Sequence, residues 1–280
     1  MKLVEKIGNG ASLVTVNGIM RVEFDCLNEY GDILIHCMST RLGGVSGGEC
    51  AALNLGFNRN DSMENVYKNF RLFCESAGLD INSLVCTRQV HGARVRVIGE
   101  NDKGKGFPGN VDGMDGVDGL VTSAPGVTMV TFHADCAPVF LFEAGIKTAS
   151  LVHSGWRGTL RNIVSAAIGV MRSIPGFDAR RVSAVIGPSI GRCCFETDGE
   201  VYALFREKFD NDAFYDPTPK GKWKIDLKGI IGHELRQEGI PPENIHDSGI
   251  CTKCRKDLFF SYRGDGGKTG SLAAFMQIRV

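Results

Sequence analysis

The sequence has little of what marks an exported, membrane-bound or nucleic-acid-binding protein. Its longest apolar stretches, such as VTMVTF and APVFLF, are far too short to cross a bilayer. The opening residues MKLVEKIGNG contain no apolar run of signal-peptide length. Lysine plus arginine and aspartate plus glutamate both total 32, so the formal net charge is zero. We therefore expect no nucleic-acid partner, because a neutral chain lacks bulk attraction for polyanions, and no membrane partner.

Internal repeats and linkers are also absent from the sequence. No stretch rich in proline or serine divides the 280 residues, so one domain over residues 1–280 is the simplest interpretation. That length is sufficient to bury a large core without disulfides. The ten cysteines are scattered and lie mostly in apolar segments. They indicate reduced thiols in a cytoplasmic protein.

Four helices are predicted from apolar residues at helical spacing. They cover residues 63–77, 157–173, a segment beginning after Thr197, and 226–239. Thr197 and Glu200 have the spacing of a capping box for the third helix. Val201, Leu204 and Phe205 are expected to form its inward face.

Short β-type runs outnumber the helices. They cover residues 33–38, 84–88, 93–98, 119–123, 127–133, 138–143, 148–153, 182–187 and 272–278. Several follow one another without a helix between them. This order favours an α+β fold with a mixed sheet and flanking helices over strict βαβ alternation. The segment 99–119, with seven glycines and four aspartates, is predicted to be a surface loop.

Polar residues stand at the ends of apolar runs. His91 follows one run, Asp135 and Cys136 lie between the end of a second and the start of a third, and His153 ends a fourth. Burying such groups is costly unless they pair, form hydrogen bonds or bind a metal. Two histidines and one cysteine suit zinc, and three protein ligands leave a fourth position open, as in catalytic sites. Asp135 could orient a ligand or transfer a proton. Spacing alone does not bring these side chains together, and each is also compatible with an ordinary structural role.

Two segments have features of anion-binding sites. Arg157 stands at a strand–turn–helix junction, where backbone N–H groups and a planar guanidinium favour phosphate. A glycine-rich loop carries Arg41 and Ser46, and its backbone could wrap an anion. An ordinary tight turn explains that loop equally well, because no P-loop lysine follows it.

The remaining cysteine motifs carry less information. Cys251 and Cys254 form a single Cys-x-x-Cys without a second such pair, so a second metal site or a redox role is the less favoured interpretation. Cys193 and Cys194 are interpreted as packed thiols, because adjacent cysteines form strained disulfides.

Eight segments together resemble one family. They are TRLGGVSGG (40–48), LNLG (53–56), RQVHG (88–92), DGLVT (118–122), ADCAPV (134–139), HSGWRGT (153–159), IGPSIGRCCFE (186–196) and FFSYRGDG (259–266). The family is the bacterial laccase-domain family, once labelled multicopper polyphenol oxidases and now mostly described as zinc-dependent purine nucleoside phosphorylases. Near FFSYR the family usually has Asn-Pro, where this chain has residues 254–257 with the sequence CRKD.

The resemblance implies a layered α/β architecture and a zinc ion bound by His91, Cys136 and His153. It implies cleavage of adenosine, inosine and methylthioadenosine with phosphate, together with deamination of adenosine. Within the matching segments we expect catalytic roles for Asp135, Cys136 and His153. Contacts to phosphate or nucleoside are expected from Arg41, Ser46, Gln89 and Arg157. Copper is unlikely as the metal, because six histidines cannot supply a trinuclear cluster as well as a Cys–His centre.

Two other functions remain open from the sequence. In a metal-free thiol hydrolase acting on an amide or peptide-like substrate, Cys136 would be the nucleophile and His153 the base, with His91 or Asp135 orienting the base. A non-catalytic partner in cell-envelope or division processes would not need Cys136 at all. The sequence carries no signal for the oligomeric state or the preferred nucleoside.

Overall fold

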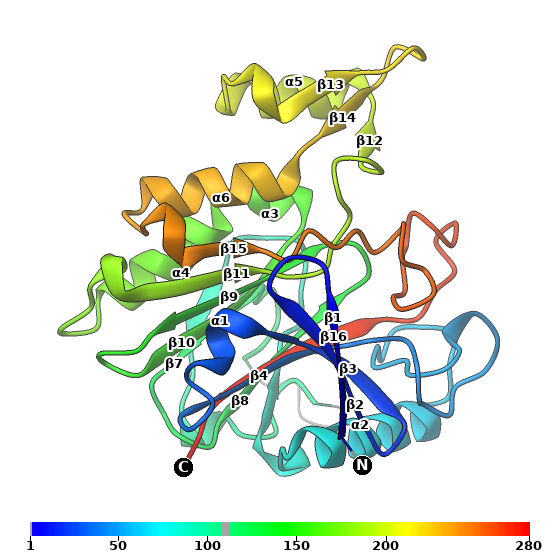
Figure 1. Cartoon of the computed structure of the whole chain (residues 1–280), viewed down its shortest axis with the longest axis vertical. Coiled ribbons are helices and arrows are strands. Elements are labelled where there is room, and N and C mark those ends of the chain that lie inside the picture. Colours follow the sequence, from blue (N-terminus) through cyan, green and yellow to red (C-terminus); the bar gives the residue numbers. More distant parts are fainter. Residues whose placement is uncertain (1, 108–112) are drawn as a thin grey trace.

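Two β-sheets face each other in the computed structural model, which describes residues 2–107 and 113–280 (Figure 1). The seven-stranded sheet has the order β1 (Lys2–Ile7), β2 (Ala11–Val16), β3 (Ile19–Phe24), β4 (Leu34–Ser39), β16 (Leu272–Ile278), β8 (Thr128–His133) and β5 (Leu84–Cys86). The six-stranded sheet has the order β15 (Ile245–Asp247), β11 (Val182–Ile186), β9 (Ala137–Glu143), β10 (Thr148–Ser154), β7 (Gly119–Thr122) and β6 (Val95–Val97). Most pairs are antiparallel, but β5–β8, β6–β7 and β11–β15 are parallel. The predicted α+β class with mixed sheets is confirmed.

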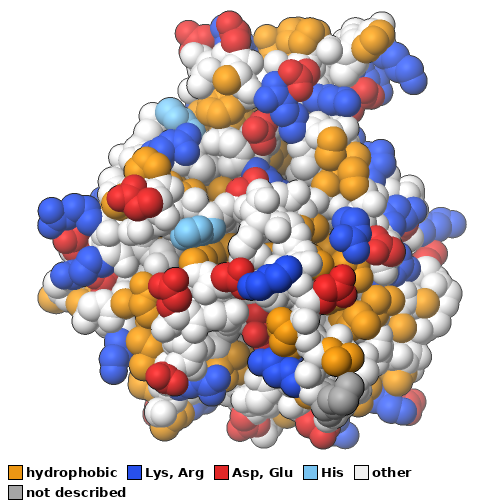
Figure 2. All heavy atoms as spheres, in the orientation of Figure 1, with side chains coloured by type: hydrophobic (Ala, Val, Ile, Leu, Met, Phe, Trp, Pro, Cys, Tyr) orange, Lys and Arg blue, Asp and Glu red, His pale blue; other side chains and the backbone are white. Residues whose placement is uncertain are grey.

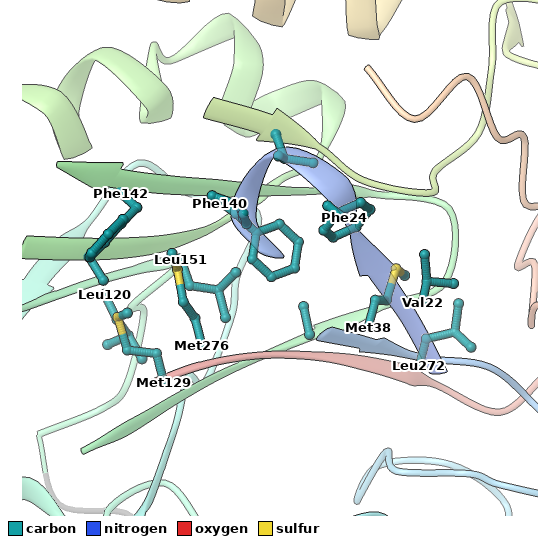
Figure 3. Close-up of a cluster of buried hydrophobic side chains, with 14 of the residues drawn as sticks. Val22, Phe24, Met38, Leu120, Met129, Phe140, Phe142, Leu151, Leu272 and Met276 are labelled. Carbon is teal, nitrogen blue, oxygen red and sulfur yellow. The ribbon is translucent and has the colours of Figure 1, made fainter. Parts of the chain in front are cut away.

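The main hydrophobic core fills the space between the two sheets. Along β16, Met276 belongs to this core, whereas its neighbour Phe275 packs on the opposite side of the strand. In β9, Phe140 and Phe142 face the other sheet and Leu141 faces the helices. This alternation follows from the two-residue period of a strand. Figure 3 shows Phe140 and Phe142 among the methionines and leucines that fill the core.

Helices cover the outer faces of both sheets. The six helices of the described residues are α1 (Asp25–Asn28), α2 (Met63–Ala77), α3 (Trp156–Leu160), α4 (Ile163–Arg172), α5 (Gly199–Lys208) and α6 (Leu227–Gln237). The apolar stripe of α2 packs on the seven-stranded sheet. Those of α4 and α6 pack on the six-stranded sheet. The result is a layered helix–sheet–sheet–helix arrangement (Figure 1).

A small unit projects beyond α6 at the top of Figure 1. It consists of α5 and a three-stranded antiparallel sheet with the order β12 (Glu196–Thr197), β14 (Trp223–Ile225) and β13 (Tyr215–Pro217). The rings of Tyr202 and Trp223 stack with centroids 3.7 Å apart. This unit has its own apolar cluster, against which Trp156 and Leu160 of α3 pack.

The helix predicted over 157–173 is wrong in one respect, because the chain forms two helices there. Asn162 adopts a left-handed conformation with φ 57° and separates α3 from α4; asparagine tolerates this conformation better than most residues. In α5 the capping residue is Asp198, whose side chain accepts from the N–H of Val201, so the predicted Thr197 cap is wrong. Leu204, predicted to face inward, is 49% exposed.

The nine predicted strands are all present, with ends that agree to within two residues. The three N-terminal strands were not predicted. The sequence does indicate the turn between β2 and β3, through the pair Asn17 and Gly18. Both residues have positive φ, of 52° and 80°. An Asn-Gly pair with this geometry is the preferred two-residue hairpin turn.

No helix of residues 2–107 and 113–280 is long and apolar enough to cross a membrane. On the face shown in Figure 2, basic and acidic side chains are interspersed.

Candidate metal centre and active-site cavity

Three side chains from the predicted strand ends meet in the structure. His91 lies in the loop after β5, Cys136 in the turn between β8 and β9, and His153 near the end of β10. Their ligand atoms all lie within 4.8 Å of one another, and the rings of His91 and His153 have centroids 5.0 Å apart. His91 and Asp135 have positive φ, of 59° and 89°. Such backbone conformations cost about 1–3 kcal/mol each and are typical of functional sites.

A buried carboxylate that sequence reasoning missed holds two of these residues. Asp118 is fully buried beneath the triad. Its Oδ1 accepts hydrogen bonds from Nδ1 of His153 at 2.9 Å and from the backbone N–H of His91 at 3.0 Å. Its Oδ2 accepts from the N–H groups of Val90 and Gly92. A carboxylate on the far nitrogen of a histidine orients the ring for metal binding.

Asp118 also corrects the prediction of a surface loop over 99–119. Met114 and Val117 belong to the core between the sheets, so the described end of this segment is buried. Part of the predicted loop, residues 108–112, lies outside the described residues. The DGLVT segment contains a signal for the burial of Asp118. An aspartate directly before a fully apolar strand is buried with that strand and then needs hydrogen-bond partners.

The electrostatics of the triad favour a thiolate. Burial opposes the charged form of Cys136, but the charge and hydrogen bond of His153, with a contribution from His91, lower the pKa of the thiol to about 6. Burial likewise opposes a charged His153, but Cys136 and Asp118 raise its pKa to about 9. A thiolate is the form of cysteine that binds metals and acts as a nucleophile.

Gly155 makes room for the triad. A Cβ at this position would lie 2.9 Å from Sγ of Cys136 and 2.9 Å from Cδ2 of His91. The backbone itself has an ordinary φ of −79°. Glycine is therefore required here by the close approach of the ligands and not by the turn.

The triad opens into a cavity of about 1510 Å³. The cavity walls come from both sheets, from α3 and from the projecting unit. Three guanidiniums on these walls, those of Arg59, Arg157 and Arg263, form no ion pair with a carboxylate of the described residues. Tyr262 also lines the cavity and is 56% exposed. Sequence reasoning had singled out only Arg157 of these four.

Asp135, Gln89 and Arg157 all line this cavity. The carboxylate of Asp135 accepts from Oγ1 of Thr252 at 2.6 Å and from the N–H of Arg263 at 2.7 Å. The amide of Gln89 is occupied by the backbone of Phe132 in β8, to which it donates and from which it accepts. The guanidinium of Arg157 lies 4.1 Å from the Trp156 ring centroid.

Arg41 and Ser46 lie apart from the residues that line the cavity. The guanidinium of Arg41 donates to the carbonyl oxygens of Ala51 and Lys256 and stacks over Phe260. The hydroxyl of Ser46 donates to Asp61 at 2.6 Å. Both polar groups thus connect parts of the chain to one another.

His133 is close to the triad but has other partners. Its Nδ1 lies 3.0 Å from the carbonyl oxygen of Cys136, and its Nε2 lies 2.8 Å from Oγ1 of Thr131. Burial lowers the pKa of His133 well below its usual range, so the ring is neutral. It supports the Cys136 turn from below.

The residues present fit a zinc ion. Two imidazoles and one thiolate are a donor set that zinc accepts. The hydrogen bond from His153 to Asp118 leaves Nε2 of that ring to face the other donors. Calcium and magnesium prefer oxygen ligands, so a site with two nitrogen donors and one sulfur donor does not suit them.

Comparisons with known proteins identify the family of this chain. The model of the family described as "Multi-copper polyphenol oxidoreductase laccase" matches residues 35–279. The chain is 32% identical to the purine nucleoside phosphorylase YlmD of Geobacillus stearothermophilus over 241 residues, which is 85% of this chain and 88% of that protein. It is also 32% identical to the adenosine deaminase RL5 of an unknown prokaryotic organism, over 84% of this chain and 91% of that protein.

Solved structures show the same fold. The crystal structure of YlmD from Geobacillus stearothermophilus superposes with a TM-score of 0.88 at 30% identity, covering 95% of this chain and 98% of that one. The chain therefore belongs to the multi-copper polyphenol oxidoreductase laccase family, and the family resemblance seen in its sequence is confirmed.

Proposed function

We propose that this chain is a cytoplasmic, zinc-dependent purine nucleoside phosphorylase that also deaminates adenosine. Adenosine, inosine and methylthioadenosine are its proposed nucleoside substrates, with phosphate as the second substrate. The convergence of His91, Cys136 and His153 at the wall of a large cavity carries the proposal. The similarity of the chain to a purine nucleoside phosphorylase and to an adenosine deaminase supports both reactions. The ten free cysteines suit a reducing compartment.

His91, Cys136 and His153 are the proposed zinc ligands. When bound, zinc supplies Lewis-acid activation of water or of a substrate oxygen. Asp118 keeps the proton of His153 on Nδ1, and thereby keeps Nε2 available. Gly155 keeps side-chain atoms out of the space between the ligands.

The cavity has the size and charge for a nucleoside with phosphate. Ligand pockets for small molecules commonly have volumes of about 300–1000 Å³, so this cavity has space for two substrates. Arg157 remains a proposed phosphate ligand. Arg59 and Arg263 join it, because within the described part of the chain each guanidinium donates only to a neutral oxygen, that of the Ser271 hydroxyl and the Glu196 carbonyl respectively. Guanidiniums bind phosphate through paired hydrogen bonds. The exposed ring of Tyr262 offers a surface on which a purine can stack.

Asp135 is the proposed proton-transfer group for both reactions. Its carboxylate lies next to Cys136 in the chain and lines the cavity. Each oxygen accepts one hydrogen bond from the protein, and a carboxylate oxygen has a second lone pair for a substrate proton. The amide of Gln89 joins the His91 loop to β8. We therefore propose that Gln89 contributes to substrate binding by fixing the shape of this part of the cavity.

The test is incubation of purified protein with adenosine, with and without phosphate, followed by chromatography of adenine, inosine and hypoxanthine. We expect phosphate-dependent adenine and phosphate-independent inosine. Cys136→Ala and His91→Ala should abolish both products, while Cys26→Ala, at a partly buried thiol remote from the triad in sequence, should keep them. If zinc is bound and adenosine stays untouched, the purine assignment fails.

A thiol hydrolase is the second candidate, supported by the low pKa of Cys136 beside His153. In that scheme Cys136 attacks an amide and His153 transfers the proton. Zinc on the thiolate would block this reaction. Alkylation of Cys136 by iodoacetamide therefore separates the candidates: rapid labelling that zinc does not slow would favour the hydrolase.

A further inference from the structure

A second group of metal-ligating side chains lies outside the triad. The structure brings Cys193 and Cys194 together with Cys251 and Cys254, although Cys193 and Cys254 are 61 positions apart. All four Sγ atoms lie within 4.8 Å of one another. Sγ of Cys254 is 3.6 Å from that of Cys193 and 3.5 Å from that of Cys194. The sequence-based interpretation of Cys193 and Cys194 as packed thiols is therefore incomplete.

The spacing of the sulfur atoms fits one metal ion. With Zn–S bonds of about 2.3 Å, the edges of a tetrahedral four-sulfur site are about 3.8 Å long. A disulfide requires about 2.05 Å between sulfur atoms, and neither the Cys193–Cys254 nor the Cys194–Cys254 distance approaches this value. An iron–sulfur cluster places several iron and sulfide atoms between its cysteines, so it needs thiolates that are farther apart.

Backbone hydrogen bonds hold the two cysteine segments in register. A parallel bridge joins Ser189 to Cys251, and the N–H of Thr252 donates to the carbonyl oxygen of Ser189 at 3.0 Å. The N–H of Gly191 donates to Sγ of Cys251 at 3.3 Å. An N–H group on a cysteine sulfur stabilises thiolate character, as expected of a metal ligand.

Gly191 lies directly beside the sulfur atoms of the cluster. A Cβ at this position would lie 3.3 Å from Sγ of Cys193 and 3.6 Å from Sγ of Cys251. At Gly155 in the first site the approach to ligand sulfur is closer, at 2.9 Å. Both groups of ligands thus have a glycine beside their sulfur atoms.

We infer that Cys193, Cys194, Cys251 and Cys254 bind a second zinc ion as a closed tetrathiolate site. Binding Zn²⁺ displaces one proton from each thiol, forms four Zn–S bonds and changes no oxidation state. Four protein ligands leave no open position, so this site is structural. It is separate from the proposed catalytic triad and does not depend on the reaction that occurs there.

The site joins two segments of the cavity wall. Cys193 and Cys194 line the cavity, as does Lys253 between the other two cysteines. Thr252, beside Cys251, donates to Asp135, which precedes the triad residue Cys136. A metal ion at the four cysteines would therefore stabilise the position of Asp135 through Thr252.

Metal counting on the full-length protein tests the inference. Wild type and variants are reduced, loaded with zinc chloride, freed of excess metal and measured by mass spectrometry for zinc per chain. We expect two zinc ions in wild type, one in Cys254→Ala and one in Cys193→Ala/Cys254→Ala. Cys136→Ala should also keep one, and Cys26→Ala should keep two. Because Cys254 is exposed, its replacement should leave the fold intact, and the zinc remaining at the triad reports this.

Spectroscopy identifies the ligands of the second ion. In His91→Ala/Cys136→Ala, X-ray absorption should show only sulfur neighbours, at about 2.3 Å from zinc. Cobalt substituted into the same variant should give the intense charge-transfer bands of a tetrathiolate. A wild-type protein with one zinc, lost in Cys136→Ala but retained in Cys254→Ala, would overturn the inference. Iron with acid-labile sulfide, or a Cys251–Cys254 disulfide that persists after reduction and zinc loading, would also overturn it.

Discussion

Replacing Asp118 by asparagine removes one charge without changing the size of the side chain. Each oxygen of Asp118 accepts two N–H donors, from His153 and His91 on one side and from Val90 and Gly92 on the other. In Asp118→Asn one oxygen becomes an NH₂ group. If the NH₂ group faces Val90 and Gly92, both backbone N–H groups lose their acceptor. If it faces His153 and His91, the N–H of His91 loses its acceptor, while Nδ1 of His153 can accept from the amide once its proton has moved to Nε2.

The magnitude follows from the lost acceptors. A buried polar group without a partner costs about 1–3 kcal/mol, so the loss of one or two acceptors in Asp118→Asn should destabilise the apoprotein by roughly 1–6 kcal/mol. This is a large part of a typical stability of about 5–15 kcal/mol. If the NH₂ group faces His153, the imidazole proton moves to Nε2, where it blocks metal binding. We expect zinc affinity to fall by about 10–100-fold, as for other carboxylates behind metal-binding histidines.

Two measurements check this prediction. Urea unfolding of the metal-free protein gives the stability, and competition with a chromogenic chelator gives the zinc affinity. Asp115→Asn is the matched control, because Asp115 is 72% exposed and pairs with Arg88 at the surface. That change should alter stability by less than about 1 kcal/mol and leave zinc binding unchanged. Wild-type stability together with wild-type zinc affinity in Asp118→Asn would refute the argument.

Three further perturbations test other parts of the structure. Gly155→Ala should lower zinc affinity at the triad on the order of tenfold, because its Cβ meets Cys136 and His91 at 2.9 Å; unchanged affinity by chelator competition would contradict this. Burial raises the pKa of Glu234 to about 8, so the folded protein keeps a proton that the unfolded chain loses near pH 4.3. Stability should therefore fall as the pH rises from about 4.3 to 8 and then level off, by up to a few kcal/mol in total. Urea unfolding at several pH values should show this fall in wild type and a smaller one in Glu234→Gln; equal slopes would count against it. Phe275→Ala should cost about 3–5 kcal/mol, because the buried ring stacks on Phe73, whereas Leu3→Ala, at a 55% exposed position, should cost far less by the same assay.

Local patterns were sufficient to predict most strands, the class of the fold and the helix α2. Strand β16 spans Leu272–Ile278, as predicted, and its alternating apolar residues supply both faces of the seven-stranded sheet. The two-residue period of a strand is a property of the backbone, so it is visible without knowledge of the partner strands. The positions of His91, Cys136 and His153 at strand ends were visible for the same reason.

The partners of those residues depend on contacts between distant segments. Asp118 reaches His153 across a strand pair in which Gly119 lies opposite Val152. The four cysteines meet because Ser189 pairs with Cys251 beside β11 and β15. The contacts of Arg41 with the carbonyl oxygens of Ala51 and Lys256 also join segments that are distant in the sequence. Spacing along a chain records the local backbone period, whereas sheet order and register arise from packing the whole core. That packing decides which buried donors, acceptors and sulfur atoms come within bonding distance.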